Sequence, residues 1–340
     1  MIFILNIIPA IVISLTLQLL IHELGHMAGG LITGWHFLYL QLLHIVICKE
    51  EKRYYLKLVN TCCCQCVMYP SFKESGALLY TAGGCMFNLI GSVAGLMIMI
   101  LYHYHIIIFL YVWSFCATGL ILFLHNAIPN TKRICNDGAC FQFLKQDKQT
   151  QLSHNLQFFC VKQLYEGKSY GDINEEYLCL PENKADNDIL AYQLVLEYYH
   201  WLDLEEYERM QKGLHKIELN PQISGNVKDI ILLERLYMEV LQKLFDMDLI
   251  PINEAFYEGN ITKYIRVHET KGDIHSIRIK ATYEIYERLM QGENEEAMKI
   301  INDAMKDVKG MKGMKGKKGI NQGEEMFCIR QLEKLKVLCS

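Results

Sequence analysis

The sequence predicts an all-α membrane protein in two parts, a three-helix transmembrane half followed by an α-helical soluble half. The first observation is compositional, because roughly the first 130 of 340 residues are strongly apolar and the remainder is charged and polar. The second is that the apolar part contains three stretches of about the length needed to cross a bilayer. The third is that the remainder places apolar residues at helical spacing between short turns.

The three predicted spans follow from the distribution of charge. Residues 1–21 carry no charge and continue into His22, and they lack the basic start and small-residue cleavage site of a signal peptide. The second and third spans cover 77–101 and 106–128, and their short link predicts a helical hairpin. Residues 35–48 are apolar but short for a crossing. We expect a strand pair or a re-entrant segment there, lying against the protein because unpaired backbone cannot face lipid.

Basic residues predict the orientation of the spans. One group lies between the first and second spans, and another follows the third. The two groups are Lys49, Lys52, Arg53, Lys57 and Lys73, and then Lys132, Arg133, Lys145 and Lys148. The pattern favours a multi-pass protein of the cell membrane with its soluble half in the cytoplasm. A bias toward Ile, Lys and Cys favours a bacterial plasma membrane.

Charge and cysteine usage exclude other classes. A net charge of -4 without a continuous basic face argues against nucleic-acid binding. The 13 cysteines are scattered through apolar and helical segments, unlike a disulfide framework. One cluster stands apart, at Cys62, Cys63, Cys64 and Cys66. Reduced thiols near a membrane surface are the favoured interpretation, while a labile metal site and S-acylation stay open.

The sequence His22-Glu23-Leu24-Gly25-His26 is the strongest chemical signal. Residues four apart share one face of a helix, so both imidazoles can bind one metal ion. Glu23 adjoins the first ligand and can take a proton from metal-bound water. The alternative, polar residues at a helix end, is disfavoured because such residues are costly in a membrane.

Catalytic zinc takes three protein ligands, and we expect the third from another span at the same depth. Asp137 follows the third span and is the predicted ligand, with His125 as its nearest rival. The start of the second span carries Gly84 and Asn88. By the predicted topology these motifs meet the two histidines on the cytoplasmic side.

These motifs resemble those of the site-2 protease family of intramembrane zinc metalloproteases. The first motif, HExxH, matches at His22, Glu23 and His26, and the second, GxxxN, matches at Gly84 and Asn88. The third, NxxPxxxxDG, matches at Asn126, Pro129, Asp137 and Gly138. It departs from the commonest form, because seven residues separate Pro129 from Asp137 instead of four. The resemblance covers residues 1–145 and implies one zinc ion per chain, held by His22, His26 and Asp137.

The resemblance also implies a reaction and its residues. Glu23 would activate zinc-bound water for attack on a peptide bond of a membrane-anchored protein or peptide, in regulated intramembrane proteolysis or peptide-precursor processing. Asn88 and Asn126 would position the substrate backbone or the oxyanion, and Gly84, Pro129 and Gly138 would shape the motif. Two alternatives remain: a catalytically inactive membrane scaffold, and a metal transporter, which the scarcity of further acids and histidines in the helices disfavours.

The soluble half, residues 150–308, resembles tetratricopeptide-type helical hairpins. The first pair is expected at 189–201 and 204–219 and the second at 275–290 and 294–308. Docking of a peptide or protein partner and a purely stabilising role are both open. Residues 309–323, rich in Lys and Gly, predict a flexible linker, and 324–340 a short helix.

Overall fold

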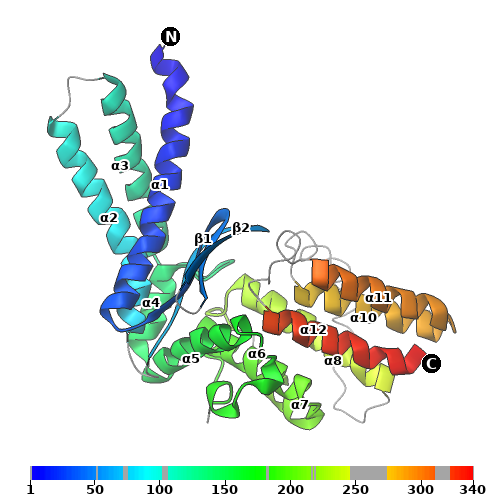
Figure 1. The fold of residues 1–340 in the computed structure, drawn as a ribbon. Coiled ribbons are helices and arrows are strands. Elements are labelled where there is room, and N and C mark those ends of the chain that lie inside the picture. The colour runs from blue at the N-terminus through cyan, green and yellow to red at the C-terminus, as the bar shows by residue number, and fades with distance from the viewer. Residues whose placement is uncertain are drawn as a thin grey trace. The chain divides into compact units, whose positions relative to one another are not determined.

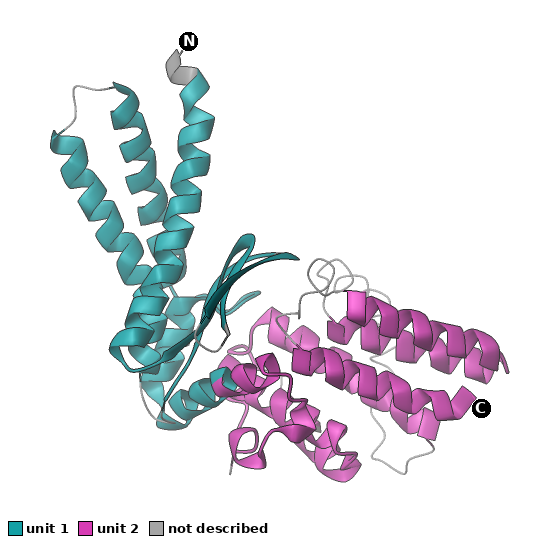
Figure 2. Cartoon of the chain, in the orientation of Figure 1, with its two compact units in different colours: residues 1–158 teal, residues 159–340 magenta. Residues whose placement is uncertain are grey.

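The computed structural model describes residues 2–50, 53–71, 76–101, 106–180, 184–215, 217, 220–245, 274–310 and 322–339. Over these ranges the chain is mostly helical, which confirms the predicted class at that level. The predicted link at 102–105 and most of the predicted linker at 309–323 lie outside the described residues. The chain divides into two compact units, 1–158 and 159–340 (Figure 2).

Unit 1 is built on three long helices, α1 (Ile2–Ile32), α2 (Ala77–Leu101) and α3 (Ile106–Ala127), which pack against one another (Figure 1). Each contains a segment long and apolar enough to cross a membrane, at Leu5–Ile32, Ala77–Leu101 and Ile106–Ala127. Large apolar side chains stay exposed along all three, as at Ile8, Ile100 and Ile121. Because soluble monomers rarely expose so much contiguous apolar surface, these helices fit a lipid environment.

Small residues let α1 and α2 cross closely. A Cβ atom at Gly25 would lie 2.3 Å from the carbonyl oxygen of Gly83, and a Cβ at Gly83 would lie 2.2 Å from that of Gly25. Glycine at such crossings is a common device of membrane helices, which gain stability from tight van der Waals packing. The crossing lies one residue before His26 and one before Gly84. It therefore sets the separation of the two helices at the predicted site.

An antiparallel hairpin follows α1, with β1 at His36–Glu50 and β2 at Arg53–Tyr69. Of the two structures expected for residues 35–48, the structure has the strand pair. Its register shifts between Leu43 and Ile45, and Leu43 takes a positive φ of 55° at this irregularity. β2 packs against α1, which brings the second half of the hairpin to the HExxH helix.

Two further helices complete the surroundings of the site. α4 (Asp137–Gln146) packs against α2 and α3, and α5 (Lys148–Tyr165) begins within unit 1. His154 of α5 is buried with its ring beside Trp35 and Phe158. Burial lowers the pKa of His154 to about 4, since its charged form is desolvated. His154 is therefore a neutral packing residue near pH 7.

The described residues of unit 2 form mainly helices and short 3₁₀ turns. Its elements are η1 (Tyr170–Asp172), η2 (Glu175–Tyr177), α6 (Asp188–Asp203), α7 (Tyr207–His215), α8 (Gly225–Phe245), α10 (Ile274–Met290), α11 (Asn294–Gly310), α12 (Gln322–Lys334) and η4 (Leu335–Cys339). The helix expected to start at residue 204 begins three residues later. The cause is local, because Glu205 adopts a positive φ of 62° and turns the chain between α6 and α7.

A buried ion pair lies inside unit 2. Arg278 and Glu234 are 2.5 Å apart with side chains 0% and 1% exposed. Glu234 also accepts hydrogen bonds from the hydroxyls of Tyr198 and Tyr199, and Arg278 lies 3.9 Å from the centre of the Tyr237 ring. Such a pair ties α6, α8 and α10 together, and removing one partner would strand a buried charge.

Candidate metal centre

The HExxH residues lie within α1, four residues apart on one helical face. His22 and His26 are 8% and 7% exposed, so both imidazoles are taken out of solvent. Their Nε2 atoms approach to 3.2 Å, with the ring planes at 81°. The helix backbone alone produces this pairing, since side chains at i and i+4 project from one face.

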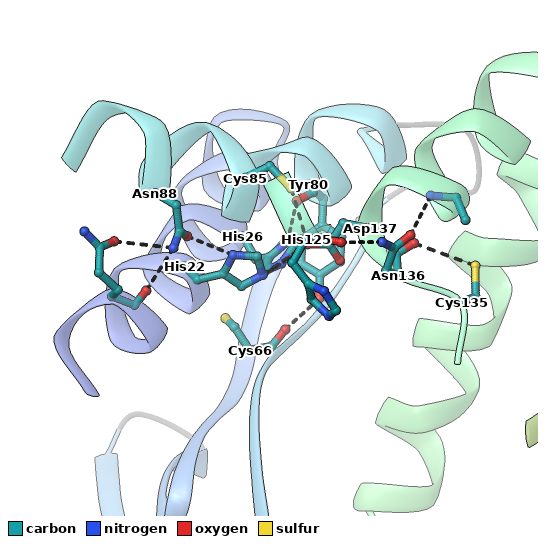
Figure 3. Close-up of polar contacts among 12 residues, drawn as sticks. His22, His26, Cys66, Tyr80, Cys85, Asn88, His125, Cys135, Asn136 and Asp137 are labelled. Atoms are coloured by element: carbon teal, nitrogen blue, oxygen red, sulfur yellow. Dashed lines mark hydrogen bonds and ion pairs between the residues drawn. The ribbon is translucent and has the colours of Figure 1, made fainter. Parts of the chain in front are cut away.

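Asp137, the first residue of α4, completes a triangle with the two histidines (Figure 3). Its Oδ2 atom lies 3.1 Å from Nε2 of His22 and 3.4 Å from Nε2 of His26. Ligand bonds of about 2.05 Å in a tetrahedral site place neighbouring ligand atoms about 3.3 Å apart. The three observed edges match that spacing. Among the described residues, these three form the group of His, Cys, Asp and Glu side chains that could hold a metal ion.

Gly84 of α2 makes room for this triangle. A Cβ atom there would lie 2.5 Å from Nε2 of His26 and 2.7 Å from Nε2 of His22. Both ligand atoms therefore rest against the bare backbone of α2. The methyl group of an alanine at position 84 would overlap the Nε2 atoms of His22 and His26.

The second nitrogen of each imidazole is held by α2. His22 Nδ1 donates to Oδ1 of Asn88 at 2.9 Å, and His26 Nδ1 donates to the carbonyl oxygen of Tyr80 at 2.8 Å. A proton on Nδ1 leaves the lone pair on Nε2, which is the atom that faces the triangle. The contacts thus select the tautomer that can bind a metal.

Asn88 was expected to contact substrate, and the structure places it behind His22. Its side chain is fully buried, and its Nδ2 donates to the backbone and side-chain oxygens of Gln18, each at 3.4 Å. Gln18 in turn donates to the carbonyl oxygen of Phe115 in α3 at 3.1 Å. One chain of polar contacts therefore joins His22 to all three apolar helices.

Asn136 positions Asp137 at the start of α4. Its Oδ1 accepts from the backbone N–H of Ala139, which is an N-cap, and from that of Asn130. Its Nδ2 donates to the carbonyl oxygens of His125 and Ile128, each at 2.8 Å. The extra residues between Pro129 and Asp137 form an exposed loop closed by Asn130 and Asn136. The lengthened spacing is thereby accommodated without moving Asp137 from the site.

The remaining motif residues lie around this loop. Gly138 allows α4 to approach the end of α3, because a Cβ there would lie 2.3 Å from the carbonyl oxygen of Ala127. Asn126 is partly exposed on the last turn of α3, and Pro129 is exposed just beyond it. The side chain of His125, the rival ligand, is exposed and lies outside the triangle of possible ligands.

Glu23 is buried beside the triangle, with 6% of its surface exposed. It lies within electrostatic range of His22, His26 and Asp137. A carboxylate in this position can exchange a proton with a water molecule at the triangle.

The charge balance of the site is set by Asp137. Burial alone would raise the pKa of this carboxyl group, but the two imidazoles that adjoin it outweigh burial when they are protonated, and the pKa then falls well below its usual range. The thiol of Cys85 also lies 3.8 Å from Oδ2 of Asp137. The ionised carboxylate is the form that a metal ion needs.

Sequence reasoning missed three supporting residues, which are Gln18, Tyr80 and Asn136. Asn136 carried a usable signal, because Asn directly before Asp-Gly is a common helix start. Gln18 is a polar residue inside an apolar span, four residues before His22, and so on the face of the site. Tyr80 carried no local signal, since its contacts with His26 and Cys66 depend on the packing of separate elements.

No protein-family model, curated protein or solved structure matches this chain. Its own residues define a mostly helical protein with three helices able to cross a membrane. Where those helices meet α4 lies a His-His-Asp cluster that can hold a metal ion, with both histidines buried and Asp137 partly exposed.

Proposed function

We propose that this protein is an intramembrane zinc metalloendopeptidase of the site-2 protease type. The observation that carries the proposal is the His22, His26 and Asp137 triangle, whose edges of 3.1 to 3.4 Å suit tetrahedral coordination, with Glu23 buried beside it. Two imidazoles and one carboxylate are a ligand set that catalytic zinc sites use, with one position left open. The three apolar helices put this site in a membrane protein.

Each residue of the site has a role in the proposed reaction. His22, His26 and Asp137 would hold a zinc ion, which would supply the acidification of a water molecule and the polarisation of a peptide carbonyl. Glu23 takes the proton from the attacking water and passes it to the leaving amine. Asn126, partly exposed beside Gly138, offers an amide to the substrate backbone or the developing oxyanion. Asn88 acts on His22, holding its metal-binding tautomer.

The substrates are proposed to be membrane-anchored proteins or peptides, because the site lies among apolar helices. The basic residues that flank the spans favour a cytoplasmic position for the site and for unit 2. Unit 2 contains two helix pairs in which three residues join the helices, α6 with α7 and α10 with α11, and this spacing supports the tetratricopeptide-like interpretation. We propose that such hairpins dock a peptide or protein partner.

The test uses purified protein in detergent and in vesicles of phosphatidylethanolamine and phosphatidylglycerol. The probe is a single-spanning peptide with a fluorophore and a quencher on either side of its apolar segment. Glu23→Gln should lower cleavage by about 10² to 10⁴-fold while zinc content stays at one per chain. Glu295→Gln, the same change on α11, is the matched control and should cleave normally.

Two results would redirect the proposal. Asp137→Ala should lose zinc while His125→Ala keeps it, and the reverse would move the third ligand. Wild-type protein that binds no zinc in metal-replete buffer, or full biological function in Glu23→Gln, would favour a scaffold whose helical unit binds a partner.

A further inference from the structure

Two cysteines flank Asp137 in the sequence, Cys135 on one side and Cys140 on the other. Their Sγ atoms are 3.0 Å apart, and either thiol can donate the hydrogen bond between them. Both side chains are partly exposed. The two thiols are therefore in contact with each other and accessible to small molecules.

The start of α4 places these thiols together. Asn136 is the N-cap of the helix, so Cys135 is the residue before the cap and Cys140 is the fourth helical residue (Figure 3). Apolar side chains at these two positions often pack against each other and fix the angle at which the chain enters the helix. In this chain both side chains are thiols, so the contact can become a covalent bond.

The distance between the two sulfur atoms favours a disulfide over a metal ion. A disulfide bond is about 2.05 Å long, so the sulfurs need to approach by about 1 Å, which small changes in the two χ1 angles can supply. A zinc ion with bonds to sulfur of about 2.3 Å would hold two thiolates about 3.8 Å apart and would push this pair outward. Among the described residues, the group that could hold a metal ion includes neither thiol.

We propose that Cys135 and Cys140 are a redox modification site, where a reversible disulfide closes residues 135–140 into a covalent ring around Asp137. The thiols are already in contact while Oδ2 of Asp137 lies in the triangle, so the bond can form without moving this carboxylate. A covalent ring removes other positions of the backbone at Asp137 and so favours the geometry that binds a metal ion. This effect on the metal rests on the proposed function, whereas formation of the disulfide does not.

The oxidant is proposed to be a hydroperoxide. The sulfur of one cysteine attacks an oxygen atom, the O–O bond breaks, and a sulfenic acid and an alcohol (water, from hydrogen peroxide) are formed. The second sulfur then attacks the first, the S–O bond breaks, and the hydroxyl group leaves with the thiol proton as water. The two thiols lose two electrons and two protons in total, and the hydroperoxide takes up both. A dithiol reverses the step by exchange.

The alternative is a purely structural contact, in which the thiols pack at the helix start and do not react. Stability alone would not separate the two roles, because both support the start of α4. The fate of the thiols under an oxidant does separate them. On the cytoplasmic side, which the basic residues favour for the site, disulfides are usually transient and redox-sensing, so the proposed bond is a response to oxidant and not a permanent crosslink.

The experiment treats zinc-loaded full-length protein in detergent with hydrogen peroxide, alkylates the remaining thiols with N-ethylmaleimide and digests with trypsin. Cleavage after Arg133 and Lys145 gives the peptide 134–145, whose two cysteines are this pair. In mass spectrometry this peptide should have lost two hydrogen atoms and should carry no maleimide. After reduction of the oxidised protein with dithiothreitol, the same peptide should carry two.

Release of zinc to a chromogenic chelator measures the effect on the metal site. Oxidised wild-type protein should release zinc at least about threefold more slowly than reduced protein, because the ring restricts Asp137. Cys135→Ser, treated in the same way, should release zinc equally fast with and without peroxide. Cys179→Ser removes another partly exposed cysteine, in unit 2, and is the matched control that should behave as wild type.

Three results would overturn the proposal or part of it. Two maleimides on peptide 134–145 after peroxide, or oxidation of its cysteines beyond the disulfide, refutes the modification site and leaves the metal site intact. Equal zinc release from oxidised and reduced wild type, with the disulfide formed, refutes the effect on Asp137. Absence of zinc in both redox states refutes the proposed function and the effect on the metal with it, while the peptide still decides whether the disulfide forms.

Discussion

Gly84→Ala adds one methyl group at the place where α2 meets the two histidines. The new Cβ would lie 2.5 Å from Nε2 of His26, about 0.9 Å inside the 3.4 Å at which ordinary contact begins. Nε2 and Cε1 of His22 would lie at 2.7 and 2.6 Å. The nearest atoms are the proposed ligand atoms themselves, so relief of the overlap must move them.

The expected loss of zinc affinity follows from the small displacement of ligand atoms that a metal site tolerates. Overpacking of this kind costs about 1 to 3 kcal/mol of stability. Ligand distances must hold to within about 0.2 Å, and a shift of close to 1 Å is several times larger. We therefore expect zinc affinity to fall by about 10²-fold or more, with the helices still formed because alanine favours helix over glycine.

The assay is zinc affinity of the detergent-purified protein, measured by competition with a chromogenic chelator. Gly91→Ala is the matched control, because it is the same substitution on the same helix and its Cβ would meet nothing closer than 3.7 Å. It should bind zinc as wild type. If Gly84→Ala also binds zinc normally while remaining folded, then the contact of the histidines with α2 is not part of a metal site.

Three further predictions concern the support of the site and of unit 2. Asn136→Ala removes the N-cap of α4 and the two side-chain hydrogen bonds that Asn136 donates to the carbonyl oxygens of His125 and Ile128. It should lower thermal stability, with about 1 kcal/mol from the cap, and weaken zinc binding in the same assay. Unchanged zinc affinity would show that Asp137 needs no such support. His154 has a folded-state pKa of about 4 against 6.5 as the reference value, so its contribution to stability is lost as pH falls from 6.5 toward 4, by about 3 kcal/mol at pH 4. His154→Leu should therefore flatten the pH dependence of the melting temperature in that window, and an identical slope would contradict the burial argument. Glu234→Ala strands the charge of Arg278 and should destabilise unit 2 by about 3 to 5 kcal/mol in denaturant unfolding, whereas a loss below about 1 kcal/mol would mean that the pair is solvated.

Several elements could be predicted because their causes are local in the chain. Apolar runs at 1–21, 77–101 and 106–128 identified α1, α2 and α3, since few other structures accommodate such runs. The pairing of His22 with His26 follows from helical geometry alone. Helix pairs in unit 2 were also visible from spacing, although the start of α7 was placed too early because the left-handed turn at Glu205 has no sequence signal.

The strand pair after α1 could not be predicted from neighbouring residues alone. Residues 35–48 are an apolar run too short for a crossing, and the sequence left both a strand pair and a re-entrant segment open. Pairing with residues 53–69 decided between them, because a strand needs a partner for its backbone groups and the partner is supplied by a different segment.

The sequence by itself determined which residues carry chemistry: two histidines one helical turn apart, a glutamate beside them, and an aspartate after the third apolar run. Only the tertiary structure decided that Oδ2 of Asp137 forms a triangle with the two Nε2 atoms, that Asn88 holds His22, and that Tyr80 reaches β2. The reason is physical. Helical spacing is a property of neighbouring residues, whereas these contacts join residues 14 to 115 positions apart, and their distances are set by how α1, α2, α4 and β2 pack against one another.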